Sequence, residues 1–386
     1  MSAIVHIITA LERGGAQRNT LETVAQLHRP ERPQWLVTGS CGDAALIEEA
    51  RERLGNRLII VPALDRPIKP WQDGRAFLEL YRCLRQLRRS LGAPLVVHTH
   101  SSKAGILGRL AARVMGNCHI VHTVHGFGFG VAVSSSQWLL ETAERMAGAV
   151  TDVLIFVSEA DRKLAHQLKL APKAAEQTIR SGIDPTPFAA IRGNLAMRSE
   201  TRRQWNIPED VPLVVTVANC KPQKDPLFHV EIFREYLKLE PEAWFLFVGD
   251  GVLKSALVSR IAEFGLTQRI VLPGFIPDSR LALAAGDVFL LASRWEGLPR
   301  SVLEAVASGL PVVVRDSGWA NDVAWARHLW SLDINSSPAA FAETIKKTLA
   351  KRRITSNYTY TDLPEEFTLS GMLTRLESLY DMLLLS

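Results

Sequence analysis

The sequence contains no long hydrophobic run. Hydrophobic residues make up 47% of the chain and charged residues 22%, yet no apolar stretch approaches the roughly 18–20 residues that a membrane-spanning helix needs. This balance is typical of a folded globular chain and excludes an intrinsically disordered one. The sequence also lacks low-complexity tracts and short-period repeats.

Cysteines are few and scattered. Cys41, Cys83, Cys118 and Cys220 form no CxxC pair and no other spacing typical of metal ligands. We therefore expect buried thiols in a reducing compartment. The first residues, MSAIVHIITA, enter an apolar strand-like run without a basic leader, so the expected location is the cytoplasm.

Positive charge slightly outweighs negative charge. The formal net charge is +5, which favours an anionic partner such as nucleic acid, a phosphorylated small molecule or an acidic membrane surface. In residues 77–91 apolar residues recur at helical spacing, and Arg82, Arg85, Arg88 and Arg89 lie mostly off the apolar stripe. This segment is interpreted as an ordinary solvated helix, and the alternative is a helix that holds the protein at the inner face of the membrane.

Short β-branched runs alternate with longer helical patterns along the whole chain. This alternation predicts parallel sheets covered by helices on both faces. The expected strands are 3–9, 34–38, 58–61, 95–99, 119–124 and 153–157 in the first half, and 212–218, 243–248, 269–272, 287–292 and 311–315 in the second. The segment 185–210 is rich in proline and charge and weak in strand signal, so we expect it to separate two doubly wound α/β lobes, residues 1–190 and 191–367.

Glycines, lysines and histidines follow several of the expected strands. Ligands of open parallel sheets bind beyond the carboxyl ends of the strands, so these residues are candidates for a site. In the first half the candidates are Gly14, Gly15, His100 and His125. In the second half they are Lys221, Lys224, Gly249, Gly251, Gly274, Phe275 and Ile276. Each of them alone is also explained by a tight turn, solvation or packing.

The stretch SRWEGLPRSVLEAVASGLP places Glu296 before a Gly-Leu-Pro turn and Glu304 on the helix that follows. One interpretation is a pair of carboxylates near the positive end of the helix dipole. A carboxylate is also the strong two-lobed acceptor that a vicinal diol needs. Backbone N–H groups near the start of this helix can face phosphates, and they belong to Gly297, Leu298, Arg300 and Ser301.

Nearly the whole chain resembles the retaining, nucleotide-sugar-dependent glycosyltransferases of the GT-B fold, in particular family four of bacterial polysaccharide and glycolipid enzymes. The matching segments are EGLPRSVLE, PQKD, VGDG, LPGFIPD, GGAQ, HTHSSKAGILGRLAA, FVSEADR and SGID. The resemblance implies two Rossmann-like lobes that face a central cleft. It also implies that the helix at 368–386 returns to complete the N-terminal, acceptor-binding lobe, while the C-terminal lobe binds the nucleotide sugar.

The resemblance also assigns roles to individual residues. Glu296 lies against the donor sugar, Glu304 accepts hydrogen bonds from the ribose hydroxyls, and His125 lies near the reaction centre. Lys224 matches the cationic site for the diphosphate leaving group, where fixed cations stabilise developing negative charge. The family often has an arginine where this chain has Asn219, and Lys221 is placed to supply the second cation. The other candidates, including Gly14 and Gly15, match loops that contact the donor.

The activity implied by the resemblance is an α-retaining transfer of a hexosyl or N-acetylhexosaminyl group. The donor would be a nucleotide sugar, UDP-linked before other nucleotides, and the acceptor a lipid-linked or glycan molecule of cell-surface polysaccharide or glycolipid synthesis. The chain has no Asp-x-Asp motif, so neither a metal nor another cofactor is expected. No nucleic-acid partner is expected. Acceptor specificity is expected in the loops at 62–74 and 126–138.

Two other functions remain compatible with this architecture. A nucleotide-sugar 2-epimerase shares the fold but lacks the combination of SRWEGLPRSVLEA with PQKD. A catalytically silent scaffold subunit of a polysaccharide assembly complex has no reason to keep Glu296, Glu304, Lys224 and His125 together. A dinucleotide-dependent oxidoreductase is poorly supported, because GGAQRN lacks the G-x-G-x-x-G spacing.

Overall fold

The chain folds into two compact α/β units. The computed structural model describes residues 2–127, 137–354 and 360–385. The first unit comprises Met1–Gly182 together with Leu369–Ser386, and the second comprises Ile183–Thr368. The chain therefore passes into the second unit ahead of the proline-rich segment 185–210, whose residues form α7 (Thr186–Ala189) and α8 (Leu195–Gln204) of that unit.

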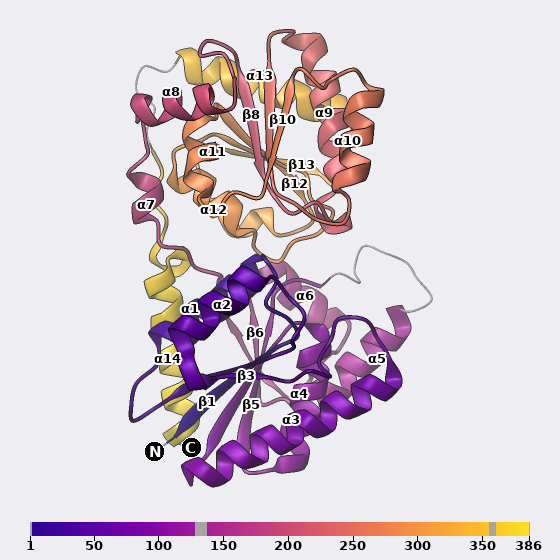
Figure 1. Ribbon diagram of the computed structural model, residues 1–386, viewed down its shortest axis with the longest axis vertical. Helices are drawn as coiled ribbons and strands as arrows, with labels where there is room; N and C mark the ends of the chain where they lie inside the picture. The colour runs from indigo at the N-terminus through magenta and orange to yellow at the C-terminus, as the bar shows by residue number, and fades with distance from the viewer. Residues whose placement is uncertain (1, 128–136, 355–359, 386) are drawn as a thin grey trace. The chain divides into compact units, whose positions relative to one another are not determined.

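The first unit contains a seven-stranded parallel sheet with the order β3-β2-β1-β4-β5-β6-β7. Its strands are β1 (Ala3–Ile8), β2 (Gln34–Thr38), β3 (Leu58–Ile60), β4 (Leu95–His100), β5 (Cys118–Val124), β6 (Val153–Phe156) and β7 (Ala175–Thr178). Its helices are α1 (Gly15–Gln26), α2 (Ala44–Leu54), α3 (Pro70–Leu91), α4 (Ser102–Met115), α5 (Gln137–Gly148), α6 (Glu159–Gln167) and α14 (Leu369–Leu385). Figure 1 shows these elements in indigo to magenta, with α14 in yellow beside them.

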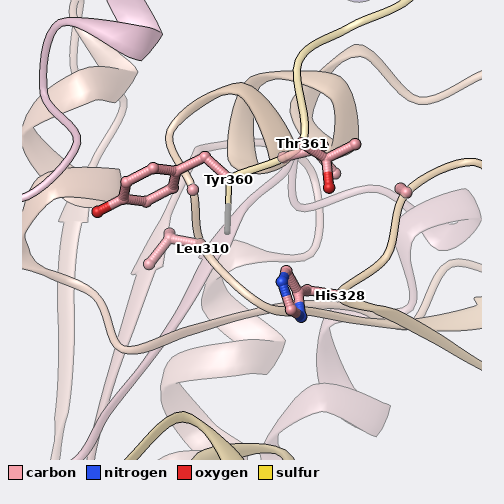
Figure 2. Close-up of a pocket in the computed structure, with 7 residues that line it drawn as sticks. Leu310, His328, Tyr360 and Thr361 are labelled. Atoms are coloured by element: carbon pink, nitrogen blue, oxygen red, sulfur yellow. The ribbon is translucent and has the colours of Figure 1, made fainter. Parts of the chain in front are cut away.

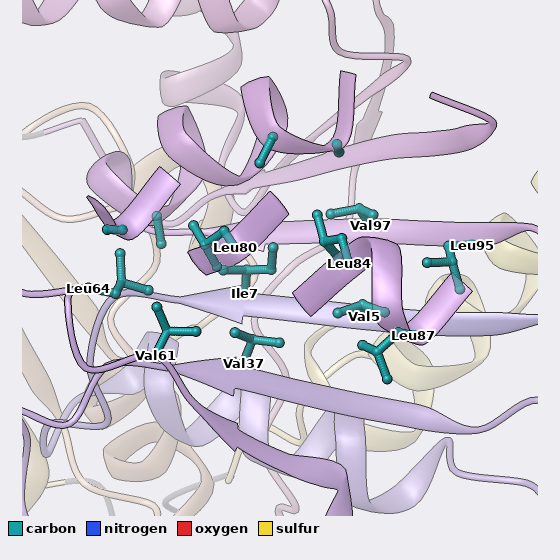
Figure 3. Close-up of a cluster of buried hydrophobic side chains, with 14 of the residues drawn as sticks. Val5, Ile7, Val37, Val61, Leu64, Leu80, Leu84, Leu87, Leu95 and Val97 are labelled. Carbon is teal, nitrogen blue, oxygen red and sulfur yellow. The ribbon is translucent and has the colours of Figure 1, made fainter. Parts of the chain in front are cut away.

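Both faces of this sheet are buried, because successive side chains of a strand point to opposite faces. One face packs on α3 and α4: Figure 3 shows Val5, Ile7 and Val97 of the strands in one cluster with Leu80 and Leu84 of α3. The hydrophobic spacing of α3 makes this contact possible. The opposite face packs on α1, α2 and α14.

The C-terminal helix α14 completes the first unit, as expected. Leu376, Tyr380 and Leu383 of this helix share a buried cluster with Ile4 and Val96 of the sheet. The helix is also held by ion pairs, since Arg32 contacts both Glu377 and Asp381.

The second unit contains a six-stranded parallel sheet with the order β10-β9-β8-β11-β12-β13. Its strands are β8 (Leu213–Val217), β9 (Trp244–Val248), β10 (Ile270–Gly274), β11 (Val288–Leu291), β12 (Val312–Asp316) and β13 (Leu329–Asp333). Besides α7 and α8, its helices are α9 (Pro226–Leu239), α10 (Lys254–Glu263), α11 (Ser279–Ala285), α12 (Arg300–Ala307) and α13 (Pro338–Ile354). The short 3₁₀ helix η3 (Pro222–Lys224) precedes α9.

The prediction of two doubly wound parallel-sheet units is confirmed, and every expected strand is present. Two strands were missed, namely β7 and β13, which are the last strands in the order of their sheets. β7 has the sequence AEQT and β13 has LWSLD, so neither contains the run of β-branched residues on which strand prediction depends.

The expectation of four buried thiols is wrong for one of them. Cys41 is exposed in the loop that follows β2, whereas Cys220 is buried and Cys83 and Cys118 are half-buried. Burial raises the pKa of each of these last three thiols to about 11.

Helix α3 has the two faces that its sequence predicts. Arg82, Arg85 and Arg89 are exposed, whereas Arg88 donates to the carbonyl oxygens of Met115 and Gly116 at 3.1 and 2.8 Å. In the part of the chain that the structure describes, no helix combines the length and apolar composition required to traverse a bilayer.

Candidate functional site

The candidate residues of the second unit gather at the carboxyl edge of its sheet. Strands β9, β8 and β11 are neighbours there, and backbone hydrogen bonds join their loops. The Cys220 N–H donates to Asp250 O at 2.9 Å, and the Arg294 N–H donates to Gln223 O at 2.8 Å. The edge is therefore one connected structure rather than a set of separate loops.

Gly249 and Gly251 allow the loop after β9 to lie against the loop after β8. Their φ angles are 151° and 152°, which side chains rarely permit. A Cβ on Gly249 would lie 1.9 Å from Ala218 O, and one on Gly251 would lie 2.7 Å from Cys220 O. Both glycines are required by the backbone approach that forms this edge.

Lys224 and Glu296 form an ion pair in the structure. The contact joins Lys224 Nζ to Glu296 Oε1, and the Glu296 side chain is only 7% exposed. Gln223 holds the same loop, because its Nε2 donates to Trp295 O at 3.0 Å and to Glu296 Oε2 at 3.4 Å. The lysine and the glutamate, predicted from separate motifs, thus belong to one cluster.

Asp225 and His229 hold in place the loop after β8 that carries Lys221 and Lys224, which we call the lysine loop. The Ala292 N–H donates to His229 Nε2 at 2.9 Å, so His229 Nδ1 carries the proton and donates to Asp225 O at 3.0 Å. The Asp225 carboxylate accepts from Arg294 Nε at 3.0 Å and from Arg315 at 3.1 Å. Burial lowers the pKa of His229 to about 4, which keeps the ring neutral and preserves this bridge between β11 and the lysine loop.

Sequence reasoning missed these supporting residues. Asp225 directly follows the PQKD lysine and has a positive φ of 47°, and His229 follows it by one helical turn at the buried start of α9. A histidine four residues after an aspartate that begins a helix could have signalled the bridge. Arg294 and Arg315 could not have been found in this way, because the aspartate brings them together only in the fold.

Glu304 lies on α12 with its carboxyl group shielded from solvent. Ser279 Oγ donates to Glu304 Oε2 at 3.2 Å. Burial raises the pKa of the Glu304 carboxyl above its ordinary value, and the nearby Arg300 charge and the Ser279 hydrogen bond act in the opposite direction. Glu304 is half-buried, and its carboxylate has one side-chain donor among the described residues, so it has remaining capacity for the hydroxyl groups of a ligand.

The other predicted residues of the second unit line the same edge. Gly274 ends β10, and its carbonyl accepts from the Gly249 N–H at 2.9 Å. Phe275 is 42% exposed, whereas Ile276 packs on the core of the unit. Asn219 and Lys221 follow β8 and are half-buried. The turn before α12 and its first residues contribute Gly297, Leu298, Arg300 and Ser301, of which Gly297 and Leu298 are buried.

The remaining predicted residues belong to the first unit. Gly14 is the N-terminal cap of α1 and Gly15 is the first residue of this helix. His125 directly follows β5, and His100 Nδ1 lies 3.2 Å from His125 Nε2. Burial lowers the pKa of His125 to about 4. The expected specificity loop at 126–138 lies largely outside the described residues, since 128–136 are not among them.

A small pocket of the second unit lies away from these groups. Figure 2 shows Leu310, His328, Tyr360 and Thr361 around it. The pocket is bounded by the residues that follow α12, and none of the predicted site residues of the described chain lines it. Arg192 stacks on the Tyr360 ring, so this region fastens the segment 360–368 to the second unit.

Each unit matches the model of a known protein family. Residues 13–186 match the glycosyltransferase family 4 model, and residues 197–361 match the model of glycosyl transferases group 1. The two models together cover most of the chain, and the gap between them, residues 187–196, lies close to the start of the second unit at Ile183.

Two of the similar proteins are bacterial enzymes named for the sugar that they transfer. The chain is 33% identical, over 67% of its length and 66% of the relative, to a UDP-Gal:alpha-D-GlcNAc-diphosphoundecaprenol alpha-1,3-galactosyltransferase of Escherichia coli. It is 26% identical, over 65% of its length and 66% of the relative, to an alpha-D-kanosaminyltransferase of Streptomyces kanamyceticus. The chain thus spans just under two thirds of the length of these relatives.

Solved structures agree in fold over the whole chain. Alr3699/HepE of Anabaena, in complex with UDP and glucose, superposes with a TM-score of 0.77 at 16% identity and covers 98% of this chain and 99% of its own. The pneumococcal O-GlcNAc transferase GtfA, in complex with UDP and GlcNAc, gives 0.70 at 13% identity, with coverage of 99% of both chains. From its motifs, its two sheets and these matches, the chain belongs to the family-four glycosyltransferases of the GT-B fold.

Proposed function

We propose that the protein is a retaining glycosyltransferase that moves a sugar from a nucleotide-sugar donor, UDP-linked, to a lipid-linked or oligosaccharide acceptor in cell-surface polysaccharide or glycolipid synthesis. The observation that carries the proposal is the cluster at the carboxyl edge of the second sheet. It combines the Lys224–Glu296 ion pair with the shielded Glu304 carboxyl and the start of α12. This combination suits a ligand that carries a diphosphate, a ribose diol and a sugar.

In this proposal the second unit binds the donor. Glu304 accepts hydrogen bonds from the ribose hydroxyls, and the glycine-rich loop after β9 with the aromatic Phe275 accommodates the nucleobase. Lys224, with Lys221, faces the diphosphate once the ligand draws it from Glu296, which then contacts the sugar. Fixed cations lower the barrier because negative charge develops on the departing phosphate oxygen.

The transfer itself breaks the bond between the anomeric carbon and the β-phosphate oxygen, and the electron pair stays with the phosphate. The acceptor hydroxyl forms the new bond on the same face of the sugar, so the α configuration is retained, and its proton leaves with the diphosphate. Because the cationic loop stabilises the leaving group, no divalent metal takes part in this proposal.

The names of the relatives support the donor and acceptor classes. One of them uses a UDP-linked galactose and an acceptor linked to diphosphoundecaprenol, and structural neighbours were solved with UDP and UDP-glucose. These donors and acceptors are known for those proteins, and we extend them to this chain only as part of the proposal.

The test is release of the free nucleoside diphosphate by the purified chain. A thermal-shift screen of UDP-, GDP- and dTDP-sugars identifies the donor, because a ligand at 100 times its dissociation constant stabilises by about 2.7 kcal/mol. We then expect nucleotide release that requires a lipid-linked saccharide acceptor, together with an α-linked product. Glu296→Gln serves as the inactive control.

Each other outcome identifies a different function. Nucleotide release without acceptor and with epimerised sugar would indicate the 2-epimerase. Stabilisation by no nucleotide sugar would favour the scaffold subunit.

A further inference from the structure

The first unit contains a row of buried histidines that the proposed function leaves unexplained. His6, His98 and His100 are at most 4% exposed. They project from β1 and β4 onto the sheet face that α1 and α14 cover, because residues two apart in a strand share a face. Buried histidines without a carboxylate partner are costly unless they remain neutral and hydrogen-bonded, so their arrangement needs an explanation.

Two of these rings, His6 and His100, form a continuous chain of hydrogen-bonding contacts with the Gln34 amide and the His125 ring. Gln34 Oε1 lies 3.1 Å from His6 Nε2, and His6 Nδ1 lies 3.1 Å from His100 Nε2. The chain ends at His125, whose Nε2 lies 3.2 Å from His100 Nδ1. The His6 and His100 ring planes differ by only 9°, which suits a hydrogen bond in the plane of both rings.

The Gln34 amide at one end of the chain determines which atom donates in each of its hydrogen bonds. The Gln34 carbonyl oxygen can only accept, so His6 carries its proton on Nε2 and leaves Nδ1 bare. His100 must then donate from Nε2 to His6 and also has a bare Nδ1. His125 in turn donates from Nε2.

We propose that Gln34, acting through His6 and His100, fixes the tautomer of His125, so that its Nδ1 is an unprotonated hydrogen-bond acceptor for a substrate hydroxyl. The inference rests on the proposed function only for the identity of that hydroxyl, which would belong to a sugar. Gln34, His6 and His100 are positioning residues, because they act through His125.

Two further observations agree with a neutral chain. Burial lowers the pKa of His6 and of His125 to about 4, and it lowers that of His100 well below the ordinary value. The other charged or titratable groups around the chain are His98, His122 and Tyr380. His98 is fully hydrogen-bonded, to Tyr380 Oη and to Thr123 Oγ1 at 2.7 Å each.

The chain ends at a pocket of the same unit. His98, His100 and His125 line this pocket with Thr123 and Ser181, and apolar residues of α14 close it on another side. Among the described residues, His125 Nδ1 has no hydrogen-bond partner. His125 is one of the residues that line this pocket, so a small hydroxyl group that enters it can reach a histidine whose protonation is already set.

A metal site is the competing explanation. His6, His98 and His100 offer ligand atoms within 4.8 Å of one another, and neutral imidazoles are common ligands. A metal would require His98 to give up its hydrogen bond to Tyr380 or to Thr123, whereas the hydrogen-bonded chain leaves both of these contacts in place. The geometry therefore favours the chain.

The proposal is tested by ¹⁵N NMR of the histidine rings in the ligand-free, full-length protein. His125 is assigned by the resonances that disappear in His125→Gln. We expect a bare Nδ1 and a protonated Nε2 at His125. In Gln34→Met, which removes the acceptor and keeps an unbranched side chain, the ratio of the two His125 tautomers should change by about 2- to 12-fold, the factor that one neutral hydrogen bond provides.

The matched control is Thr99→Val. It breaks the 2.9 Å contact between Thr99 Oγ1 and His122 Nδ1, which lies outside the chain, and should leave the His125 ratio unchanged. The proposal is overturned if His125 is protonated on Nδ1 in the wild type, which a reversed Gln34 amide would impose, or if Gln34→Met does not change the ratio. It is also overturned if added Zn²⁺ shifts the His6, His98 and His100 resonances together.

The experiment separates this inference from the proposed function. The tautomer is measured without substrate, whereas the function is tested by nucleotide release. If Gln34→Met remains folded by circular dichroism, its kcat should fall with little change in the KM for the donor, because the donor groups of the second unit are untouched. Unchanged kcat despite an altered tautomer would overturn the role of the chain in catalysis.

Discussion

At the scale of single residues, the two glutamates of the second unit have different surroundings. Glu304 is shielded and has one side-chain donor, Ser279, whereas Glu296 is paired with Lys224. Both were expected from the sequence as one motif. The structure separates them into a group ready to accept hydrogen bonds and a group already neutralised by a cation.

Glu304→Gln should weaken binding of the free nucleoside diphosphate. If Glu304 holds the ribose diol, the change weakens hydrogen bonds to a charged group, worth roughly 1.5–3 kcal/mol, and lowers affinity about 10- to 150-fold. Isothermal calorimetry with UDP measures the effect.

Glu296→Gln is the matched variant. It should leave UDP affinity equal or slightly tighter, because it releases Lys224, while turnover falls. An equal loss of UDP affinity in both variants would show that the two glutamates act as one anionic patch and that the division of roles does not hold.

Lys224→Ala should reduce turnover more than Lys221→Ala. Removing a fixed cation from a developing oxyanion costs about 2.7–4 kcal/mol, or on the order of 100- to 1000-fold in rate. Lys224→Ala also leaves the largely buried Glu296 without its cation. Steady-state kinetics compare the two variants, and a larger loss in Lys221→Ala would mean that Lys221 is the principal cation.

At the scale of helices and strands, α3 is the candidate for membrane contact. Its exposed face carries Arg82, Arg85 and Arg89, and Trp71 in its first turn is 92% exposed. Arg88 is engaged with the carbonyl groups after α4 and should contribute little. Exposed arginines and an exposed tryptophan on one helix suit an anionic bilayer surface.

Reversing one of these exposed charges should weaken binding to anionic vesicles. A basic residue near such a surface contributes about 1 kcal/mol, so each of Arg82→Glu, Arg85→Glu and Arg89→Glu should lower affinity on the order of fivefold or more. Vesicle sedimentation at low and high salt measures this. Arg51→Glu on α2 is the control, and equally tight binding to neutral vesicles would reduce α3 to an ordinary solvated helix.

The elements with a strong local sequence signal were predictable from the sequence. β9 and β11 are continuous apolar runs, and the glycine and lysine motifs directly follow strands. The edge strand β7 was missed because its sequence is polar, and its strand conformation comes from pairing with β6. The bridge from Asp225 to Arg294 and to Arg315 of β12 joins segments that are distant in sequence, so only the fold reveals it.

The histidine row shows the same limit at the candidate site. His100 and His125 were expected at strand ends, and they lie there. Their link to Gln34 depends on strand order, which places β2, β1, β4 and β5 side by side. No spacing in the sequence indicates that Gln34 of β2 is linked through hydrogen bonds to His125, which follows β5.

At the scale of the whole molecule, the distribution of buried histidines predicts unequal acid stability. Burial lowers the pKa of His6, His98, His100, His122 and His125 in the first unit, and of His229 in the second. Below about pH 6.5 these histidines bind protons in the unfolded chain but remain neutral in the folded one. The free energy of unfolding is therefore highest above that pH and falls toward pH 4, by about 1.4 kcal/mol per pH unit for each histidine.

The first unit should accordingly open before the second as pH falls from 6.5 to 4. Hydrogen–deuterium exchange, corrected for the intrinsic effect of pH, resolves the two units by their peptides. His122→Gln should reduce the pH dependence of the first unit, because burial lowers the pKa of His122. Simultaneous opening of both units would contradict the prediction.

Turnover should persist in excess EDTA. The reason is the cationic loop of Lys221 and Lys224, which we propose as the group that stabilises the leaving diphosphate. Complete loss of nucleotide release in EDTA, restored by magnesium or manganese, would contradict that part of the mechanism.

The return of α14 to the first unit also sets an order of events during synthesis. The strands of the first unit leave the ribosome early, but the cluster around Ile4, Val96 and Val121 stays uncovered until Leu369–Leu385 has been made. The second unit is contiguous from Ile183 to Thr368 and can fold as soon as it emerges. Although domains usually fold in the order of translation, here the unit translated second should mature first, and a nascent chain stalled before Leu369 should present an apolar surface to chaperones.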